Sequence, residues 1–354
     1  MSQPLIKVED LSYSHPVRGG VSVPALRGIS LEIEEGEYVA IVGANGSGKT
    51  TLAMHFNGLL MPDQGKVLIQ GMDTRDRHHM PAIHSLVGMI FQAPEDQLVA
   101  GVLEEDTAFG PENLGLPPEE IRQRVEQALR VTGLWEQRQR PPHLLSAGQM
   151  QRAALAGVLA MHPRCVIFDE TTAMLDPAGR RMVQELIDSL HREGLTVIVI
   201  THFMQEAGLA ERMVVLQGGQ IALDGPPRQL FAQGDRLHAL GLDLPRAARL
   251  AAQLRPLLPG IPDIPLTLTE LTRDFPAYDG AEASEKIEAN VPCENGGWLS
   301  AEHLEHTYLK DTPLAHVALR DVSICVEESG KHGLIGATGS GKSTLLQHLN
   351  GLLA

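Results

Sequence analysis

The sequence lacks any long apolar segment. None of its uninterrupted apolar runs approaches the roughly 20 residues that a membrane-spanning helix needs. The first residues, Met1 to Val8, also lack the pattern of a cleavable signal peptide. Any role at a membrane is therefore expected to be peripheral.

Cysteine and positive charge are also scarce. The three cysteines, Cys165, Cys293 and Cys325, lie far apart without paired spacing, which suits a reducing compartment such as the cytoplasm and predicts neither a disulfide framework nor a metal site. Lys and Arg total 29 against 44 Asp and Glu, and the resulting net charge of −15 would repel a phosphate backbone. We therefore expect no nucleic-acid partner.

What is present is typical of a globular protein. The composition is 43% hydrophobic and 21% charged, and a length of 354 residues suits one large domain plus part of another.

An internal repeat explains that length. At an offset of 293 residues, Leu11 aligns with Leu304, Ala25-Leu26-Arg27 matches Ala318-Leu319-Arg320, and Asn57-Gly58-Leu59-Leu60 matches Asn350-Gly351-Leu352-Leu353. Because the sequence ends at Ala354, the second copy is expected to be only the beginning of a domain, from a truncated record or a disrupted gene. Without the strands that complete its sheet, it is expected to expose apolar surface.

Short apolar runs predict buried strands of a parallel sheet, at Val39 to Val42, Val166 to Phe168 and Thr196 to Ile200. Helical spacing predicts an amphipathic helix from Glu119 to Leu134 and a further helix from Leu244 to Leu258. Residues 274 to 297 are acidic and poor in aliphatics, as in an exposed linker. The predicted organisation is a complete domain (1–240), a C-terminal helical appendage (241–272), a linker (273–298) and the start of a second domain (299–354).

A glycine-rich segment after the first predicted strand matches the Walker A pattern. In it the glycines let backbone N–H groups surround phosphate oxygens, Lys49 would reach the β- and γ-phosphates, and Thr50 would ligate Mg²⁺. A glycine-rich turn is the alternative, but the motif recurs at Gly336 to Ser343. The predicted nucleotide-binding residues are Gly43, Asn45, Gly46, Ser47, Gly48, Lys49, Thr50 and Thr51.

Two adjacent carboxylates end the second predicted strand. After the run Val166-Ile167-Phe168, Asp169 could hold Mg²⁺ and Glu170 could polarise an attacking water. Acidic strand ends are common in solvated turns, so the preceding Walker A motif is what favours the catalytic interpretation.

The segment Leu145-Ser146-Ala147-Gly148-Gln149 resembles the signature sequence of ABC ATPases. A serine hydroxyl, small residues and a helix N-terminus together suit an anion, although a capped helix start would look the same. The resemblance implies an α/β P-loop NTPase with a parallel core sheet, an antiparallel β subdomain and a helical subdomain. It also implies that Ser146, Gly148 and Gln149 contact ATP held by an opposite domain. Ala147 stands where the family usually has glycine.

Three more positions fit this family in order. Gln92 matches the Q-loop glutamine that senses Mg²⁺ and water, Leu175-Asp176 matches the D-loop, and His202 matches the switch histidine that contacts the γ-phosphate. The resemblance thus implies that Glu170, His202 and Gln92 are catalytic and that Asp176 lies by the nucleotide. The implied metal ligands are Thr50, Gln92 and Asp169.

Within the ABC group, the stretches Phe91 to Leu98 and Glu105 to Gly115 resemble the ATPases of energy-coupling-factor transporters. That resemblance covers about Val8 to Leu271 and resumes at Leu304. It implies ATP hydrolysis with Mg²⁺, coupled to uptake of vitamins or transition-metal ions at the cytoplasmic face of the membrane. The implied partners are a membrane scaffold protein, a separate substrate-binding membrane protein and a second ATPase domain, from a homodimer or a related ATPase.

The adenine-stacking position differs between the copies. It is His15 in the first, where a plain surface histidine is the alternative, and Tyr308 in the second. The second copy lacks a signature, Walker B carboxylates and a switch histidine, so it is not expected to complete an ATP site. Its predicted nucleotide-binding residues are Tyr308, Gly336, Gly339, Ser340, Gly341, Lys342, Ser343 and Thr344.

Two other functions stay open from the sequence. A soluble ABC-type mechanical ATPase would need no membrane partner, although the acidic charge and the absence of long coiled-coil insertions count against it. A truncated chain could also bind nucleotide without turning it over.

Overall fold

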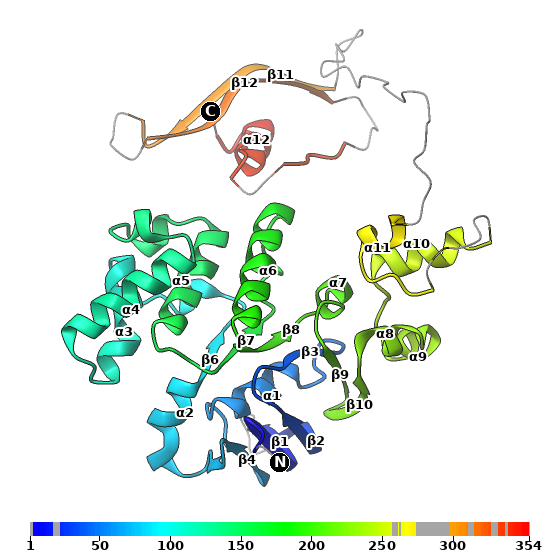
Figure 1. Cartoon of the computed structure of the whole chain (residues 1–354). Helices are drawn as coiled ribbons and strands as arrows, with labels where there is room; N and C mark the ends of the chain where they lie inside the picture. The colour runs from blue at the N-terminus through cyan, green and yellow to red at the C-terminus, as the bar shows by residue number, and fades with distance from the viewer. Residues whose placement is uncertain are drawn as a thin grey trace. The chain divides into compact units, whose positions relative to one another are not determined.

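The structure is a computed structural model that describes residues 3–16, 22–256, 261, 263–273, 298–310, 315–326, 332–336 and 339–353. The chain forms two compact units, which are considered separately (Figure 1). The first comprises Met1–Leu175 and Gly179–Pro276, and the second comprises Asp176–Ala178 and Ala277–Ala354.

A six-stranded sheet forms the centre of the first unit. Its order is β10-β9-β3-β8-β7-β6, and every neighbouring pair is parallel except β10 with β9. The three predicted strands are confirmed as β3 (Tyr38–Val42), β7 (Cys165–Asp169) and β8 (Thr196–Ile200), all fully buried. The others are β6 (Val87–Ile90), β9 (Arg212–Gln217) and β10 (Gln220–Gly225). Parallel strands align their carboxyl ends, so the residues after β3, β6, β7 and β8 share one edge.

An antiparallel sheet of order β2-β1-β4-β5 packs on one face of this central sheet. Its strands are β1 (Ile6–Pro16), β2 (Ser22–Ile33), β4 (Gln64–Ile69) and β5 (Met72–Asp73). Helix α1 (Lys49–Phe56) is buried in the same layer, and α2 (Met80–Leu86), preceded by the 3₁₀ turn η1 (Arg77–His79), contributes Ile83.

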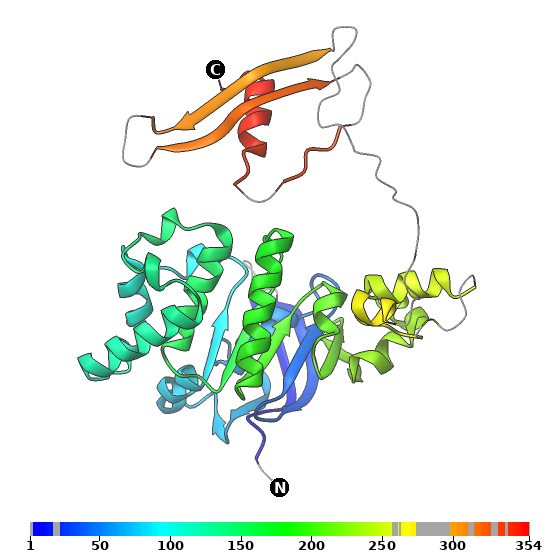
Figure 2. The same ribbon diagram turned by 45° about the horizontal axis from the view of Figure 1, so that its top comes forward.

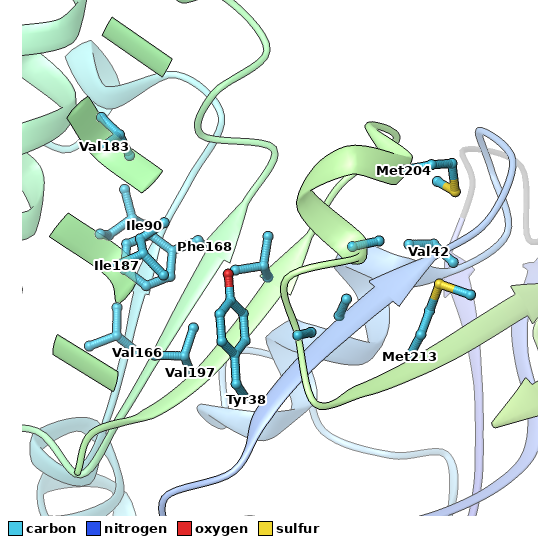
Figure 3. Close-up of a cluster of buried hydrophobic side chains, with 14 of the residues drawn as sticks. Tyr38, Val42, Ile90, Val166, Phe168, Val183, Ile187, Val197, Met204 and Met213 are labelled. Atoms are coloured by element: carbon cyan, nitrogen blue, oxygen red, sulfur yellow. The ribbon is translucent and has the colours of Figure 1, made fainter. Parts of the chain in front are cut away.

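The other face of the central sheet carries a second core, part of which Figure 3 shows. There α6 (Pro177–Arg192) places Val183 and Ile187 against the strands, and α7 (Met204–Ala207) places Met204. Successive residues of β3 alternate between the two cores: Ala40 and Val42 face this one, and Val39 and Ile41 face the other. This alternation explains why the strand is apolar throughout.

A helical subdomain lies at one side of the sheet, with its own small core (Figure 2). It contains α3 (Leu103–Asn113), α4 (Pro118–Val131) and α5 (Ala147–Leu159), with the 3₁₀ turns η2 (Pro94–Asp96), η3 (Trp135–Gln137) and η4 (Pro142–Leu144). Helix α4 ends three residues before the predicted Leu134, because Gly133 takes a φ of 66° and the Leu134 N–H donates back to Leu129 O at 2.7 Å. The predicted parallel core sheet, antiparallel subdomain and helical subdomain are thus confirmed.

Among the described residues of the first unit, four helices follow β10: α8 (Pro227–Phe231), α9 (Gly234–Ala239), α10 (Arg246–Leu254) and α11 (Leu268–Thr272). The predicted helix from Leu244 begins later, because Pro245 is the N-cap of α10; residues 257 and 258, at its predicted end, lie outside the described residues. Residues 274–297, which make up nearly all of the predicted linker (273–298), also lie outside the described residues.

The second unit repeats the start of the first. It contains the antiparallel pair β11 (Leu299–Tyr308) and β12 (His316–Val326), then α12 (Lys342–Leu349). Several of its apolar side chains are exposed, as predicted: Ile335 is 95% exposed and Leu352 is 73% exposed, whereas Leu319 and Leu345 are buried. One expectation is wrong, because Cys325 is disulfide-bonded although the spacing of the cysteines indicated no pairing.

Within the described ranges, no helix is both long enough and apolar enough to cross a membrane.

Candidate functional site

The glycine-rich loop between β3 and α1 has a backbone that its glycines make possible. Gly46 and Gly48 take φ values of 77° and 102°, in the left-handed region that favours glycine, and Gly48 is the N-cap of α1. A Cβ at Gly43 would lie 2.3 Å from Leu216 O and 2.6 Å from Ser47 Oγ. The loop therefore accepts no side chain where its backbone turns.

Neighbouring elements hold this loop in place. The Gly219 N–H, in the β9–β10 turn, donates to Ser47 O at 3.2 Å, and the Arg27 N–H of β2 donates to Gly219 O at 2.9 Å. A Cβ at Gly48 would meet Ala25 O at 2.7 Å, so β2 also lies directly against the loop. The loop is thus preorganised before any ligand arrives.

Lys49 points back into the loop. Its Nζ donates to Gly43 O at 2.9 Å and to Ala44 O at 3.2 Å, and the side chain is buried. Burial lowers the pKa of Lys49, whereas the carboxylates of Glu170 and Asp169 act to raise it. The Ser47 hydroxyl is buried beside it without a hydrogen-bond partner. Both groups could bond an anion held by the loop.

Asp169, the last residue of β7, is buried and contacts the start of α1. Burial raises the pKa of its carboxyl group, and Glu170 adds to this; a hydrogen bond from the Thr50 side chain and the charge of Lys49 oppose it. Among the described residues, Asp169 Oδ1 has no hydrogen-bond partner. A buried carboxylate oxygen without a partner, next to a threonine hydroxyl, fits a hard divalent cation.

Glu170 and His202 come together at the same edge of the sheet. Glu170 follows β7, His202 comes two residues after β8, and Glu170 Oε2 lies 3.7 Å from His202 Nδ1. Glu170 holds a positive φ of 50°, rare for a residue with a side chain, and its N–H donates to Ile200 O at 2.9 Å. The side chain of Glu170 is 19% exposed and that of His202 is 47% exposed, so water can reach both.

Gln92 lies just beyond β6, with an exposed side chain. Its carbonyl oxygen accepts from Gln151 Nε2 of α5 at 3.3 Å. Sequence reasoning missed Gln97, which fastens this segment: the Phe91 N–H donates to Gln97 Oε1 at 2.9 Å, and Gln97 Nε2 donates to Met89 O at 3.1 Å. The amide thus takes the place of a further strand at the edge of the sheet.

His15, at the end of β1, is exposed and lies beside α1. Its Nε2 is 3.0 Å from the hydroxyl oxygen of Thr51, and its ring meets that of Tyr13 edge-on at 5.1 Å. In the second unit Tyr308 makes the corresponding contact, with its hydroxyl 3.2 Å from Thr344 Oγ1. The two copies therefore place an aromatic ring at the same position relative to the helix.

The signature segment begins α5 as a capping box. Ser146 Oγ accepts from the Gln149 N–H at 3.3 Å, and Gln149 Oε1 accepts from the Ser146 N–H at 2.9 Å. An added Cβ at Gly148 would meet only Leu175, at 3.9 Å. The capped helix start is thus present, and it leaves open space beside Gly148.

The second unit repeats the phosphate loop. Gly341, with a φ of 87°, is the N-cap of α12, and Lys342 Nζ donates to Gly336 O at 2.7 Å. Gly339 also has a positive φ, 80°. Ser340 and Ser343 lie on either side of this turn, beside Lys342.

The structure brings one group of the predicted residues together: Lys49, Thr50, Asp169, Glu170 and His202 are linked by the contacts given above. In the described parts of the chain, the hydrogen bonds of Ser146 and Gln149 join these two residues to each other and not to the phosphate loop. Asp176 directly precedes α6.

A second residue that sequence reasoning missed is Glu206 of α7. It is buried, and its carboxylate accepts 2.6 Å hydrogen bonds from the hydroxyls of Thr172 and Thr201. Only the proximity of Glu206 to His202 in the sequence could have drawn attention to it.

Comparison with known proteins agrees with this geometry. The family model described as ABC transporter matches residues 26–173 and 319–354. The chain is 48% identical to the energy-coupling factor transporter ATP-binding protein EcfA1 of Caldanaerobacter subterraneus subsp. tengcongensis, over 75% of this chain and 97% of that protein. It is 51% identical to the EcfA1 protein of Symbiobacterium thermophilum, over 77% of this chain and 96% of that protein.

Solved structures give the same result. The structure of cbiO1 from Clostridium perfringens, described as part of the ABC transporter complex cbiONQ, is similar with a TM-score of 0.61 and 35% identity, over 73% of this chain and 97% of that one. A dimeric ATP-binding cassette bound to ADP and phosphate is similar with a TM-score of 0.58 and 28% identity, over 63% of this chain and 99% of that one. The chain therefore belongs to the ABC transporter family and, within it, to the ATP-binding proteins of energy-coupling factor transporters, and it is an ATPase.

Proposed function

We propose that this chain powers an energy-coupling-factor importer for vitamins or transition-metal ions from the cytoplasmic face of the membrane. The observation that carries the catalytic part is the position of Glu170 and His202, 3.7 Å apart, at the sheet edge that also presents Lys49. The relatives named above support the transport part.

The first phosphate loop would hold the triphosphate of ATP. Lys49 Nζ would exchange its bonds to Gly43 O and Ala44 O for bonds to phosphate oxygens, and the buried Ser47 hydroxyl would gain a partner. The N-terminus of α1 would add its dipole and free N–H groups. His15, held by Thr51, would lie by the base.

Thr50, Asp169 and Gln92 would hold Mg²⁺. The unpartnered Asp169 Oδ1 and the Thr50 hydroxyl are hard oxygen ligands of the kind Mg²⁺ prefers, and phosphate oxygens and waters would complete the shell. When bound, Mg²⁺ would neutralise charge on the phosphate oxygens.

Glu170 would orient and polarise the attacking water, and His202 would donate a hydrogen bond towards the γ-phosphate. The strained backbone of Glu170 is in keeping with such a role, because it turns the carboxylate out of the strand at a fixed angle.

Two complete domains would be needed for turnover. Ser146, Gly148 and Gln149 are not bonded to the phosphate loop of their own domain, so they would face the nucleotide of a partner ATPase, a second copy or a related chain. Asp176 would lie at that interface. The loop of the second unit, through Lys342, would bind phosphate without supplying a catalytic carboxylate.

A groove beside the Q-loop segment would receive the membrane scaffold protein. It encloses about 580 Å³ between α2, α3 and α5, and its lining includes Leu59, Phe91, Gln97, Phe109 and Met161. Phe109 is 54% exposed and Leu59 is 50% exposed, which suits an apolar helix of the partner. Because Gln97 lies in the groove and bonds the segment that bears Gln92, a helix docked there would sense the nucleotide site.

Affinity purification of the full chain from membranes tests the transport function. We expect a multi-span scaffold protein and a substrate-binding membrane protein to co-purify, and uptake of the bound vitamin or metal ion to require ATP. Glu170→Gln should bind ATP with unchanged affinity and lose turnover. Turnover with no membrane partner would point to a soluble mechanical ATPase instead, and absence of turnover in the wild-type chain would show an inactive nucleotide-binding protein.

A further inference from the structure

Glu206 is the most buried carboxylate next to the site that has no assigned role. It lies on α7, only 5% exposed, and each of its oxygens accepts one short hydrogen bond. Thr172 Oγ1 donates to Oε1 and Thr201 Oγ1 donates to Oε2, both at 2.6 Å. Hydrogen bonds to an ionised acceptor are short and about twice as strong as neutral ones.

The two threonines belong to the two loops that carry the catalytic pair. Thr172 comes two residues after Glu170, and Thr201 comes directly before His202. Glu206 therefore joins the end of β7 to the end of β8 through side chains. Thr201 Oγ1 also accepts from the Phe203 N–H at 3.0 Å, which orders the segment on the far side of His202.

The remaining contact of Glu206 is a weak ion pair. Arg180 Nε of α6 lies 3.8 Å from Glu206 Oε1, and its guanidinium stacks on Phe203 at 3.8 Å from the ring centroid. The bonds that hold the carboxylate are thus mainly those of the two threonines. A buried charge is costly unless it is hydrogen-bonded, so both loops are held firmly to it.

We propose that Glu206 is a positioning residue for ATP hydrolysis, whose carboxylate fixes the spacing between the loops of Glu170 and His202. The inference rests on the roles given to these two residues above. Neither Thr172 nor Thr201 is bonded to the phosphate loop in the described structure, so loss of the bridge should slow hydrolysis and leave ATP binding intact. Misplacement by about 1 Å can lower a rate by about 100-fold.

Glutamine weakens the bridge, because it removes the negative charge that strengthens both hydrogen bonds. A Glu206→Gln side chain offers one acceptor oxygen and one NH₂ donor where two acceptors are needed. The NH₂ group would have to donate to one of the two threonine hydroxyls, which would then have to turn its own proton to another acceptor.

The test uses the full chain, four single variants and one double variant. Glu206→Gln and Thr172→Val each remove part of the bridge, and Thr172→Ser restores the hydroxyl. Thr74→Val is the matched control, because Thr74 is fully buried and its hydroxyl finds no hydrogen-bond partner in the part of the chain that the structure describes. For each we would measure kcat and KM for ATP, equilibrium binding of ATP, and the melting temperature.

We expect Glu206→Gln and Thr172→Val to lower kcat on the order of 10- to 100-fold, with ATP affinity unchanged within about twofold. Thr172→Ser should recover most of the loss, and Thr74→Val should keep wild-type kcat. The double variant Glu206→Gln/Thr172→Val should lose less than the product of the single losses, because both act on one bridge.

Wild-type kcat in folded Glu206→Gln and Thr172→Val would overturn the inference. So would a parallel loss of ATP binding, or an equal loss in Thr74→Val, since each would show a general structural effect. Failure of the proposed function is seen separately: Glu170→Gln would then turn over ATP at the wild-type rate.

Discussion

Gly88 of β6 lies directly against Val158 of α5. A Cβ added at Gly88 would lie 2.2 Å from Val158 Cγ1. Two carbon atoms in contact prefer a separation of about 3.5 Å or more, so in Gly88→Ala the new Cβ or Val158 Cγ1 must move by about 1.3 Å. Valine in a helix has essentially one χ1 rotamer, so Val158 cannot turn away, and the backbones of β6 and α5 must separate instead.

The expected cost follows from these contacts. Overpacking of a core lowers the free energy of unfolding by about 1–3 kcal/mol, whereas replacing a strand glycine by alanine raises it by about 0.5–1 kcal/mol. We therefore expect Gly88→Ala to lower the free energy of unfolding by about 1–2 kcal/mol. Urea unfolding of the full chain, followed by far-UV circular dichroism, measures this as a lower midpoint with an unchanged slope.

Two further variants make the test specific. Val158→Ala removes the clashing methyls, so the double variant Gly88→Ala/Val158→Ala should be at least about 1 kcal/mol more stable than the sum of the two single effects. Gly157→Ala is the matched control on the same helix: no atom lies within 4 Å of its added Cβ, so it should stabilise by about 0.8–1 kcal/mol. Wild-type stability of Gly88→Ala, or simple additivity in the double variant, would refute the steric reasoning.

Three further predictions concern the site. Burial raises the pKa of Asp169, so between its ordinary pKa and the raised pKa the folded state holds more proton than the unfolded state, and stability falls as pH rises. Asp169→Asn removes this titration and should raise the nucleotide-free melting temperature at pH 7, by an amount that shrinks in acid. A lower melting temperature of Asp169→Asn at pH 7 would contradict this. Ser146→Ala should cost about 1 kcal/mol in urea unfolding, whereas Ser146→Asp should keep the cap and lose ATPase turnover by repelling phosphate; equal turnover in Ser146→Asp and wild type would leave only the capping role. Gln97→Glu keeps an acceptor for the Phe91 N–H but cannot donate to Met89 O, so it should cost about 1 kcal/mol in urea unfolding, and an unchanged midpoint would count against this bridge.

The phosphate loop could be predicted from the sequence because its structure is local. Its conformation depends on glycines at positive φ and on the start of a helix, which neighbouring residues specify. Both copies show this: Lys49 bonds Gly43 O at 2.9 Å, and Lys342 bonds Gly336 O at 2.7 Å.

The first hairpin has a bulge that the second copy repeats. The Asp10 N–H donates to Ser30 Oγ at 3.1 Å, and in the second copy the His303 N–H donates to Ser323 Oγ at 3.0 Å. Asp10 and His303 have φ values of 47° and 54°. The repeat in the sequence therefore predicts a repeat of the backbone, even where the residue type changes.

Gln97 and Glu206 could not be predicted in this way. Each acts on partners that the fold brings to it: Gln97 on the backbone at the edge of the sheet, and Glu206 on Thr172, which is 34 positions away. A glutamine or glutamate outside a motif has no distinguishing pattern, because such residues are mostly exposed. Only the packing of β6, β7, β8 and α7 shows what these two side chains bind.

The segment before each phosphate loop shows most clearly which features follow from the local sequence and which depend on the tertiary structure. Val39–Val42 and its counterpart 332–335 both end in aliphatic residues, yet the first lies in the buried strand β3 and the second is irregular, with Ile335 95% exposed. β3 is paired on both sides, by β8 and β9, and among the described residues of the second unit no strand takes those places. The sequence by itself determined the turn, the helix and the lysine of the phosphate loop. The tertiary structure decided whether the preceding residues form a strand, because a buried strand needs neighbours to satisfy its backbone hydrogen bonds and to cover its side chains.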